Sequence, residues 1–302
     1  MNVLFINPAE PRCGVSAFGS SCHDILKKSI RHNYTLQSWY DPTMPVEHDF
    51  DVAIFNYHNK LFPWLDNDTI KWMGIPCMAI GGHDCYPDFS ELKFVLNCDS
   101  TSIADERNIP LPRPVKTFAP LPDPEIVTIG SCGFDFSSKN YQHVATYVAQ
   151  SYDNAKIRLH IPQHPSGEGI NNIGHLIQQQ LFNLGKPGIS VEVSIDFLSD
   201  DELIGFLSGN TANVFLYPPF KNERRGLSSV IDKALSARKP IAISDSTMYR
   251  HINLEEKFLL SRHSLKEIIE FGTEHIEKFW EANSEQKLIE AFDSAVDKCV
   301  CS

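Results

Sequence analysis

The segment with the clearest chemical character follows an apolar run at 214–217 and leads into an amphipathic stretch. It gathers acidic, basic, glycine and hydroxyl residues: Glu223, Arg224, Arg225, Gly226, Leu227, Ser228 and Ser229. A helix that opens at 226–229 would aim its first N–H groups at one point, where an oxyanion also meets hydroxyl and guanidinium groups. Asp232, one turn further along, would reach a ribose or sugar hydroxyl. A serine-capped helix with surface arginines, one of them paired with Asp232, is the structural alternative.

Two glycine-containing loops have related chemistry. Gly14 and Val15 follow the first apolar run, and N–H groups at the start of the next helix suit a phosphate, although Gly14 also fits a plain tight turn. Gly133 opens the first loop of the C-terminal half, which ends at Lys139 in the first turn of a predicted helix. A lysine there opposes the helix dipole unless an anion binds, and a solvated surface lysine is the alternative. We also assign His160, at a strand end, to donor binding.

Two histidines follow predicted strands of the N-terminal half. His58 comes after the third strand, and His83 with Asp84 comes after the fourth. Histidine at such an edge binds a sugar hydroxyl or acts as a base near neutral pH, and these three residues are the catalytic candidates. A hydrogen-bonded structural histidine is the alternative reading. The sequence has no HExxH and no CxxC pattern, and the Asp-Asn-Asp triplet at 66–68 reads as a helix N-cap, so we expect no metal site.

The elements that must position these residues alternate between strands and helices. Apolar runs predict strands at 3–7, 35–39, 52–56, 77–80, 94–96, 126–130, 157–161, 191–195, 214–217 and 241–244. Helical patterns lie at 17–30, 68–73, 139–151, 172–184, 200–208, 227–237, 265–282 and 285–298. This alternation predicts an α/β chain with two Rossmann-like parallel sheets, whose ligands bind beyond the carboxyl ends of the strands.

A proline-rich connector separates the two halves. Six prolines lie at 110, 112, 114, 120, 122 and 124, and proline is excluded from helix interiors and central strands. At most a short strand fits at 115–119. We therefore expect an N-terminal, acceptor-side domain at 1–120 and a C-terminal, nucleotide-sugar-binding domain at 121–302. The last helix, 285–298, is placed to pack back on the N-terminal domain.

Composition narrows the class of protein. The 302 residues carry a formal net charge of −11, and their lysines and arginines are scattered, so nucleic acid is not an expected partner. The eight cysteines form no CxxC pair and read as reduced thiols of a cytoplasmic protein. The apolar run at 3–7 is too short for a signal peptide. Peripheral membrane contact stays an open alternative. The segment 25–32, with only three basic residues, is too weakly basic to assign it.

Taken in chain order, these segments resemble GT-B glycosyltransferases, especially the retaining GT4-like group. The segment 197–203 is similar to the family's strand-to-helix passage, and Arg225 to Leu235 resembles its phosphate-binding loop and helix. Cys13-Gly14-Val15 is similar to the N-terminal glycine loop, and the loop from Gly133 to Lys139 resembles the one whose basic residue contacts the pyrophosphate. Two departures stand out. The family's glutamate pair is incomplete, with Glu223 matching only in a shifted register, and its arginine before the lysine is missing.

The resemblance implies two Rossmann-like domains that face each other across a cleft. It implies a glycosyltransferase that takes a UDP- or GDP-linked sugar, needs no metal or further cofactor and retains the anomeric configuration. The acceptor, whether glycan, lipid or another molecule, is not specified. If the enzyme instead inverts, His58, His83 or Asp84 has to be the base. The alternatives are an inactive GT-B module that binds a glycan or nucleotide, a GT-B-like sugar-nucleotide epimerase, and a metal-dependent GT-A enzyme.

Overall fold

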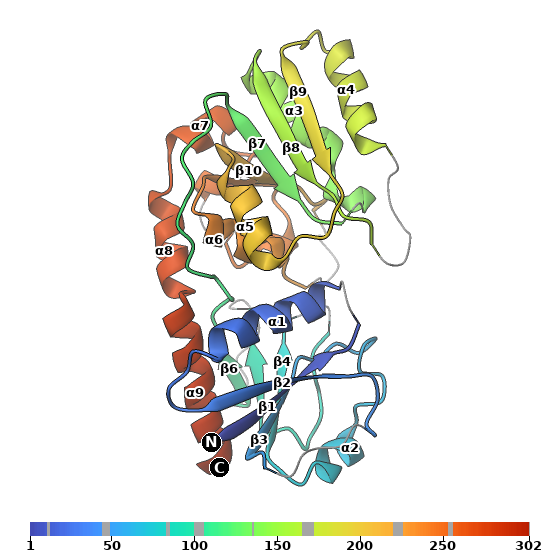
Figure 1. Cartoon of the computed structure of the whole chain (residues 1–302), viewed down its shortest axis with the longest axis vertical. Helices are drawn as coiled ribbons and strands as arrows, with labels where there is room; N and C mark the ends of the chain where they lie inside the picture. Colours follow the sequence, from blue (N-terminus) through green and yellow to red (C-terminus); the bar gives the residue numbers. More distant parts are fainter. Residues whose placement is uncertain are drawn as a thin grey trace. The chain divides into compact units, whose positions relative to one another are not determined.

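The computed structural model describes residues 1–10, 13–43, 49–82, 85–99, 106–134, 136–164, 172–219, 226–252 and 256–301. The chain forms two compact units (Figure 1). The first contains Met1–Lys116, Arg225–Leu227 and Ala282–Ser302, and the second contains Thr117–Arg224 and Ser228–Glu281. Both ends of the chain therefore belong to the first unit.

The first unit is built on a six-stranded parallel sheet of order β2-β1-β3-β4-β5-β6. Its strands are β1 (Asn2–Pro8), β2 (Asn33–Trp39), β3 (Val52–Phe55), β4 (Cys77–Gly81), β5 (Phe94–Asn97) and β6 (Asn108–Pro110). Its helices are α1 (Gly14–Leu26), α2 (Asn67–Trp72) and α9 (Glu285–Cys301). Because all strands are parallel, their carboxyl ends share one edge.

Both faces of this sheet are covered. Along β1, Val3 and Phe5 belong to the apolar cluster beneath α1 and α9, whereas Leu4 and Ile6 belong to the cluster on the opposite face. Alternate side chains of a strand point to opposite faces, so a strand that is buried on both sides becomes a continuous apolar run. This double burial is why the runs in the sequence predict the strands so directly.

The second unit has a five-stranded parallel sheet of order β11-β10-β7-β8-β9. Its strands are β7 (Thr128–Cys132), β8 (Ala155–His160), β9 (Ile189–Ser194), β10 (Ala212–Phe215) and β11 (Ile241–Ile243). Its α-helices are α3 (Tyr141–Ser151), α4 (Ile173–Asn183), α5 (Asp200–Ser208), α6 (Val230–Ala237), α7 (Leu265–Glu270) and α8 (Glu274–Ala282). Three short 3₁₀ turns join them: η1 (Ser137–Lys139), η2 (Thr247–Tyr249) and η3 (Glu256–Phe258).

The connector is extended at 115–119 and does not join the sheet, which agrees with the expectation of at most a short strand there. Two other local features differ from the prediction. Strand β6 was not predicted. It pairs only with β5 in the described sheet, and Pro110 is tolerated there because an edge strand leaves one side unpaired. The helix predicted at 265–282 is two helices, α7 and α8. Gly272, with φ of +66°, has the left-handed backbone conformation that ends a helix.

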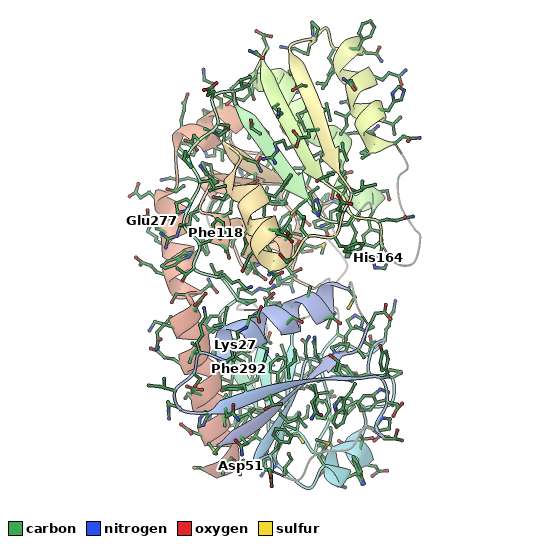
Figure 2. All side chains as sticks on the ribbon, viewed as in Figure 1. Lys27, Asp51, Phe118, His164, Glu277 and Phe292 are labelled. Atoms are coloured by element: carbon green, nitrogen blue, oxygen red, sulfur yellow. The ribbon has the colours of Figure 1, made fainter. Side chains whose placement is uncertain are left out.

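The C-terminal helix α9 packs on the sheet of the first unit through a buried polar contact as well as apolar ones. Asp293, 2% exposed, accepts hydrogen bonds from the Ser29 hydroxyl at 2.8 Å and from the Tyr34 hydroxyl at 2.9 Å. Burial, followed by the neighbouring Asp293 carboxylate, raises the pKa of Tyr34. Phe292, labelled in Figure 2, is fully buried and meets the rings of Phe5 and Tyr34. Within the described residues, no helix has the length and apolarity that a membrane crossing requires.

We predict that Phe292→Ala destabilises the first unit by about 3–5 kcal/mol, because it removes a fully buried aromatic ring and leaves a cavity. Urea unfolding measures the loss. The control is Val300→Ala on the same helix, where 46% of the residue is exposed and the cost should stay within about 0.5 kcal/mol. Equal losses for the two variants would show that α9 is not held by its buried face.

Candidate functional site

The glycine loop of the first unit is fixed by side-chain hydrogen bonds to its backbone. Helix α1 begins directly after Cys13, whose sulfur accepts a hydrogen bond from the Ser16 N–H at 3.2 Å. The Ser16 hydroxyl donates to the carbonyl of Glu10 at 2.7 Å, and the Asn56 amide donates to the carbonyl of Val15 at 2.7 Å. Gly14 is exposed and has open space where a Cβ would stand. Hydrogen bonds from Ser16 and Asn56 therefore fix the backbone of the loop, whereas Gly14 is exposed to solvent.

A close approach between α1 and the sheet depends on another glycine, Gly19. A Cβ at Gly19 would overlap the side-chain amides of Asn7 and Asn56. Asn56 donates to the Asn7 side-chain oxygen at 2.8 Å, and Asn7 in turn donates to the carbonyl of Ser16 at 3.0 Å. The edge of this sheet beside the glycine loop thus carries neutral amide groups, and the sequence analysis did not identify them.

Of the three catalytic candidates, only His58 lies within the described residues. It follows β3, which pairs directly with β1, so it stands at the same sheet edge as the glycine loop. Its Nδ1 accepts a hydrogen bond from the Lys60 N–H at 3.2 Å, and its carbonyl accepts from Leu61 and Phe62. His58 therefore has a local structural role in a turn. His83 and Asp84 lie outside the described residues.

The second unit places Lys139 against the end of β7. Lys139 belongs to the 3₁₀ turn η1 rather than to the first turn of α3, and Asn140 follows it with a left-handed φ of 50°. Its side chain is only 8% exposed, so the reading of a solvated surface lysine is wrong. The loop glycine makes this position available, because a Cβ at Gly133 would stand 2.8 Å from the Lys139 Nζ. Gly133 also has φ of +127°, which disfavours any side chain.

One tyrosine contacts this lysine, and two further tyrosines hold the groups beside it. The Lys139 Nζ lies 4.5 Å from the ring centroid of Tyr217, just beyond β10. The ring of Tyr249 in η2 packs against Tyr217 at 5.6 Å, and Tyr249 is fully buried. The Tyr141 hydroxyl donates to the Gly133 carbonyl at 2.6 Å, which fixes the loop. These tyrosines were not singled out from the sequence, because their common location depends on three strand ends.

His160 ends β8, beside Cys132 at the end of β7. Its carbonyl accepts a hydrogen bond from the Gly133 N–H at 3.1 Å, and its Nδ1 lies 2.9 Å from the Ser194 hydroxyl. The residue is 3% exposed, and its burial lowers the pKa of the imidazole, while Asp196 opposes that effect. Burial likewise raises the pKa of the neighbouring Cys132 thiol to about 12.

An aromatic cluster occupies the same sheet edge, where loops follow β7, β8 and β9. Phe134 lies 4.8 Å from His164 and 6.4 Å from Phe197 between ring centroids, and Phe136 lies 4.9 Å from His164. Figure 2 labels His164 on the loop beyond β8. Phe197 is 42% exposed, so the cluster offers aromatic surface to a ligand. The loop from Gly133 to Lys139 and the segment 197–203 were named from the sequence, but their rings were not, because Phe134 and Phe197 are 63 residues apart along the chain.

The stretch before α6 differs from its prediction. Glu223, Arg224 and Arg225 lie outside the described residues, and α6 begins at Val230 rather than at 227. The N–H groups of Leu227 and Ser228 donate to the carbonyls of Gly82 and Met248, so they do not converge on an anion. Ser229 precedes the helix without a side-chain cap bond.

Two aspartates that the sequence singled out, Asp232 and Asp66, both lie within the described residues. Asp232 is 1% exposed in the first turn of α6, and the adjacent Lys233 forms an ion pair with Asp200 of α5. The burial of Asp232 leaves little surface for the ribose contact that the sequence suggested. Asp66 caps α2 by accepting from the Thr69 N–H at 2.7 Å, as predicted. Among the described residues, no three His, Cys, Asp or Glu side chains gather as metal ligands would.

The sequence matches no family model and no curated protein. Solved structures do match. The lipopolysaccharide outer core galactosyltransferase WaaB, in its apo form, has a TM-score of 0.62 and 12% identity over 99% of both chains. HepE from Anabaena in complex with UDP has a TM-score of 0.57 and 12% identity over 99% of this chain and 96% of that one. A mutant O-GlcNAc transferase from Thermobaculum terrenum has 0.54 and 13% over 99% and 67%. The chain therefore has the GT-B fold, as its sequence predicted.

We predict a pH effect on stability from His160. Because burial lowers the pKa of this histidine in the folded state, the unfolded chain binds the proton more readily. Its contribution is therefore complete above the unfolded pKa of about 6.5 and is lost as the pH falls below it. Urea unfolding at pH 7.5 and 5.5 should show a smaller difference for His160→Gln than for the wild type. Identical differences in both proteins would contradict the burial effect.

Proposed function

We propose that this protein is a glycosyltransferase that moves a sugar from a nucleotide-diphosphate sugar to an acceptor. The observation that carries the proposal is the environment of Lys139. Its side chain is 8% exposed at the carboxyl edge of the second sheet, and it forms no ion pair with a described carboxylate. A cation that is withdrawn from water without a carboxylate is stabilised by an anionic ligand. Parallel α/β sheets bind their ligands at this edge.

A diphosphate is the anion that fits a transferase of this fold. When the bond between the sugar and the diphosphate breaks, negative charge grows on the phosphate oxygens of the leaving nucleoside diphosphate. The Lys139 ammonium stabilises that charge, and it does so more effectively in a site with little water. We therefore propose that no metal is required. Arg225, which the resemblance also assigns to the diphosphate, and the hydroxyls of Ser228 and Ser229 are further candidates.

The aromatic cluster of Phe134, Phe136, His164 and Phe197 supports the nucleotide part of the proposal. Aromatic side chains stack on nucleobases, and such contacts are worth about 1–3 kcal/mol per base. UDP- and GDP-linked sugars are the candidate donors. HepE, one of the proteins with the same fold, was solved in complex with UDP-glucose, which makes the UDP-linked donor the first to test.

The first unit takes the acceptor in this proposal. The glycine loop after β1, where Gly14 is exposed, contacts the hydroxyls of a glycan or of another neutral acceptor, and the buried amides of Asn7 and Asn56 hold that loop in place. His83 or His58 orients the sugar. We propose retention of the anomeric configuration, because the order of motifs along the chain resembles that of the retaining GT4-like group. NMR of the product's anomeric proton distinguishes retention from inversion.

Thermal unfolding against UDP-, GDP- and ADP-linked sugars, with and without EDTA, tests donor binding. A ligand at a hundredfold excess over its dissociation constant adds about 2.7 kcal/mol to the free energy of unfolding. We expect one donor class to raise the melting temperature equally with and without EDTA. Lys139→Met should remove this rise. Lys156→Met, which breaks an exposed ion pair with Glu192, is the matched control and should keep it.

Product analysis separates the activities that donor binding leaves open. Transfer to a sugar, glycan or lipid acceptor supports the proposal. Conversion of the sugar nucleotide without any acceptor would make the protein an epimerase, and binding without turnover would make it a GT-B binding module. A melting temperature that no donor changes, in the presence or absence of acceptors, would contradict the proposal.

A further inference from the structure

The contact between Lys139 and Tyr217 holds a charge without neutralising it. The Lys139 Nζ stands 4.5 Å from the centre of the Tyr217 ring. The negative face of an aromatic ring attracts a cation, and this attraction grows when water is excluded. A carboxylate in the same place would also hold the ammonium, but it would compete with an incoming anion. An aromatic ring leaves the full charge for that anion.

The position of Tyr217 is itself fixed by two independent contacts. The Ser244 hydroxyl accepts from the Tyr217 N–H at 2.8 Å and donates to the Tyr217 carbonyl at 2.7 Å. Tyr249, fully buried, supports the ring from a second direction at 5.6 Å. The Tyr249 hydroxyl has no hydrogen-bond partner within the described part of the chain. The contact that Tyr249 makes with Tyr217 is therefore one between the two rings.

We infer that Tyr217 is a positioning residue that holds the Lys139 ammonium in place for the diphosphate of the donor. This inference rests on the proposed function and adds to it the residue that orients the key cation. Tyr217 acts through its ring and not through its hydroxyl. Without the ring, the flexible lysine side chain would lose its fixed direction. Ordering that side chain on binding would then lower the affinity for the diphosphate.

Calorimetry tests the inference by measuring the binding of UDP, GDP, ADP and inorganic pyrophosphate. Uridine and guanosine are measured in parallel as nucleosides without phosphate. We expect Tyr217→Leu to weaken the binding of the preferred diphosphate by about tenfold, the loss of one desolvated cation–ring contact. Tyr217→Phe, which keeps the ring, should bind within about twofold of the wild type. Affinity for the free nucleoside should not change in either variant, because the nucleoside carries no phosphate.

A control variant separates this effect from the loss of any cation–ring contact in the same unit. Trp280→Leu removes the ring that lies 3.8 Å from the Arg238 guanidinium, on α8. It should leave diphosphate affinity unchanged.

An NMR measurement without nucleotide gives a readout that does not depend on activity. In protein labelled with ¹³C at the lysine ε carbon, the Lys139 signal is identified by its absence in Lys139→Met. A methylene beneath the face of the Tyr217 ring should resonate upfield of the other lysines, remain there in Tyr217→Phe, and return to the common position in Tyr217→Leu. If Tyr217→Leu fails to fold, Tyr217→Met replaces it. An ordinary Lys139 shift in the wild type would overturn the inference without any variant.

The outcomes separate the two proposals. If the wild type binds none of the diphosphates nor pyrophosphate, the proposed function fails, and the positioning role fails with it. If Lys139→Met loses diphosphate binding while Tyr217→Leu binds like the wild type, only the positioning role fails. An equal loss of nucleoside affinity in Tyr217→Leu would also overturn it, because such a loss indicates general damage to the site.

Discussion

The second unit is arranged around one constraint, a lysine ammonium that is nearly buried yet is not paired with a described carboxylate. The constraint accounts for features that otherwise have no common cause. Gly133 has no side chain where the Lys139 Nζ lies, and its backbone adopts a conformation that favours glycine. Tyr217 presents a ring to the charge, and Ser244 pins the backbone of that tyrosine from both sides. Each contact restricts where the ammonium can go while leaving its charge available.

The fold supplies the place for such a charge. Each sheet is parallel and lies beneath helices, so the middles of the strands carry almost only apolar side chains. Amide side chains that enter the interior form hydrogen bonds with each other. Asn210 donates to Asn213 at 2.9 Å, and a Cβ at the adjacent Gly130 would overlap this pair. Charged groups that must meet a ligand are therefore restricted to the carboxyl edges, where the strands end and loops begin.

The same physics decides what the sequence predicts. Strands that are buried on both faces, such as β3 and β4, are continuous apolar runs, whereas β2 and β9 are partly exposed and carry polar residues. Among the described strands, ten were located from the sequence and the short edge strand β6 was missed. The alternation of strands with helices predicts two parallel-sheet α/β units, and the resemblance of the loop segments to GT-B glycosyltransferases implies the GT-B fold. The first residue of a helix is harder to predict, because it depends on hydrogen bonds whose partners lie elsewhere in the chain. The N–H groups of Leu227 and Ser228 donate to carbonyls distant in sequence, and α6 begins later than expected. The site was predicted in part. Lys139 was singled out, but its burial beside Tyr217 depends on strand order.

The two sheet edges differ in charge, and this difference bears on what each unit binds. Beside the glycine loop of the first unit stand the neutral amides of Asn7 and Asn56, which are paired with each other and with the loop backbone. The edge of the second unit carries the Lys139 ammonium. An ammonium gains most from an added negative charge, whereas buried amides that are already paired hold the loop backbone and not a ligand. Under the proposed function, the anionic donor therefore belongs to the second unit, whose edge carries the charge that a diphosphate needs.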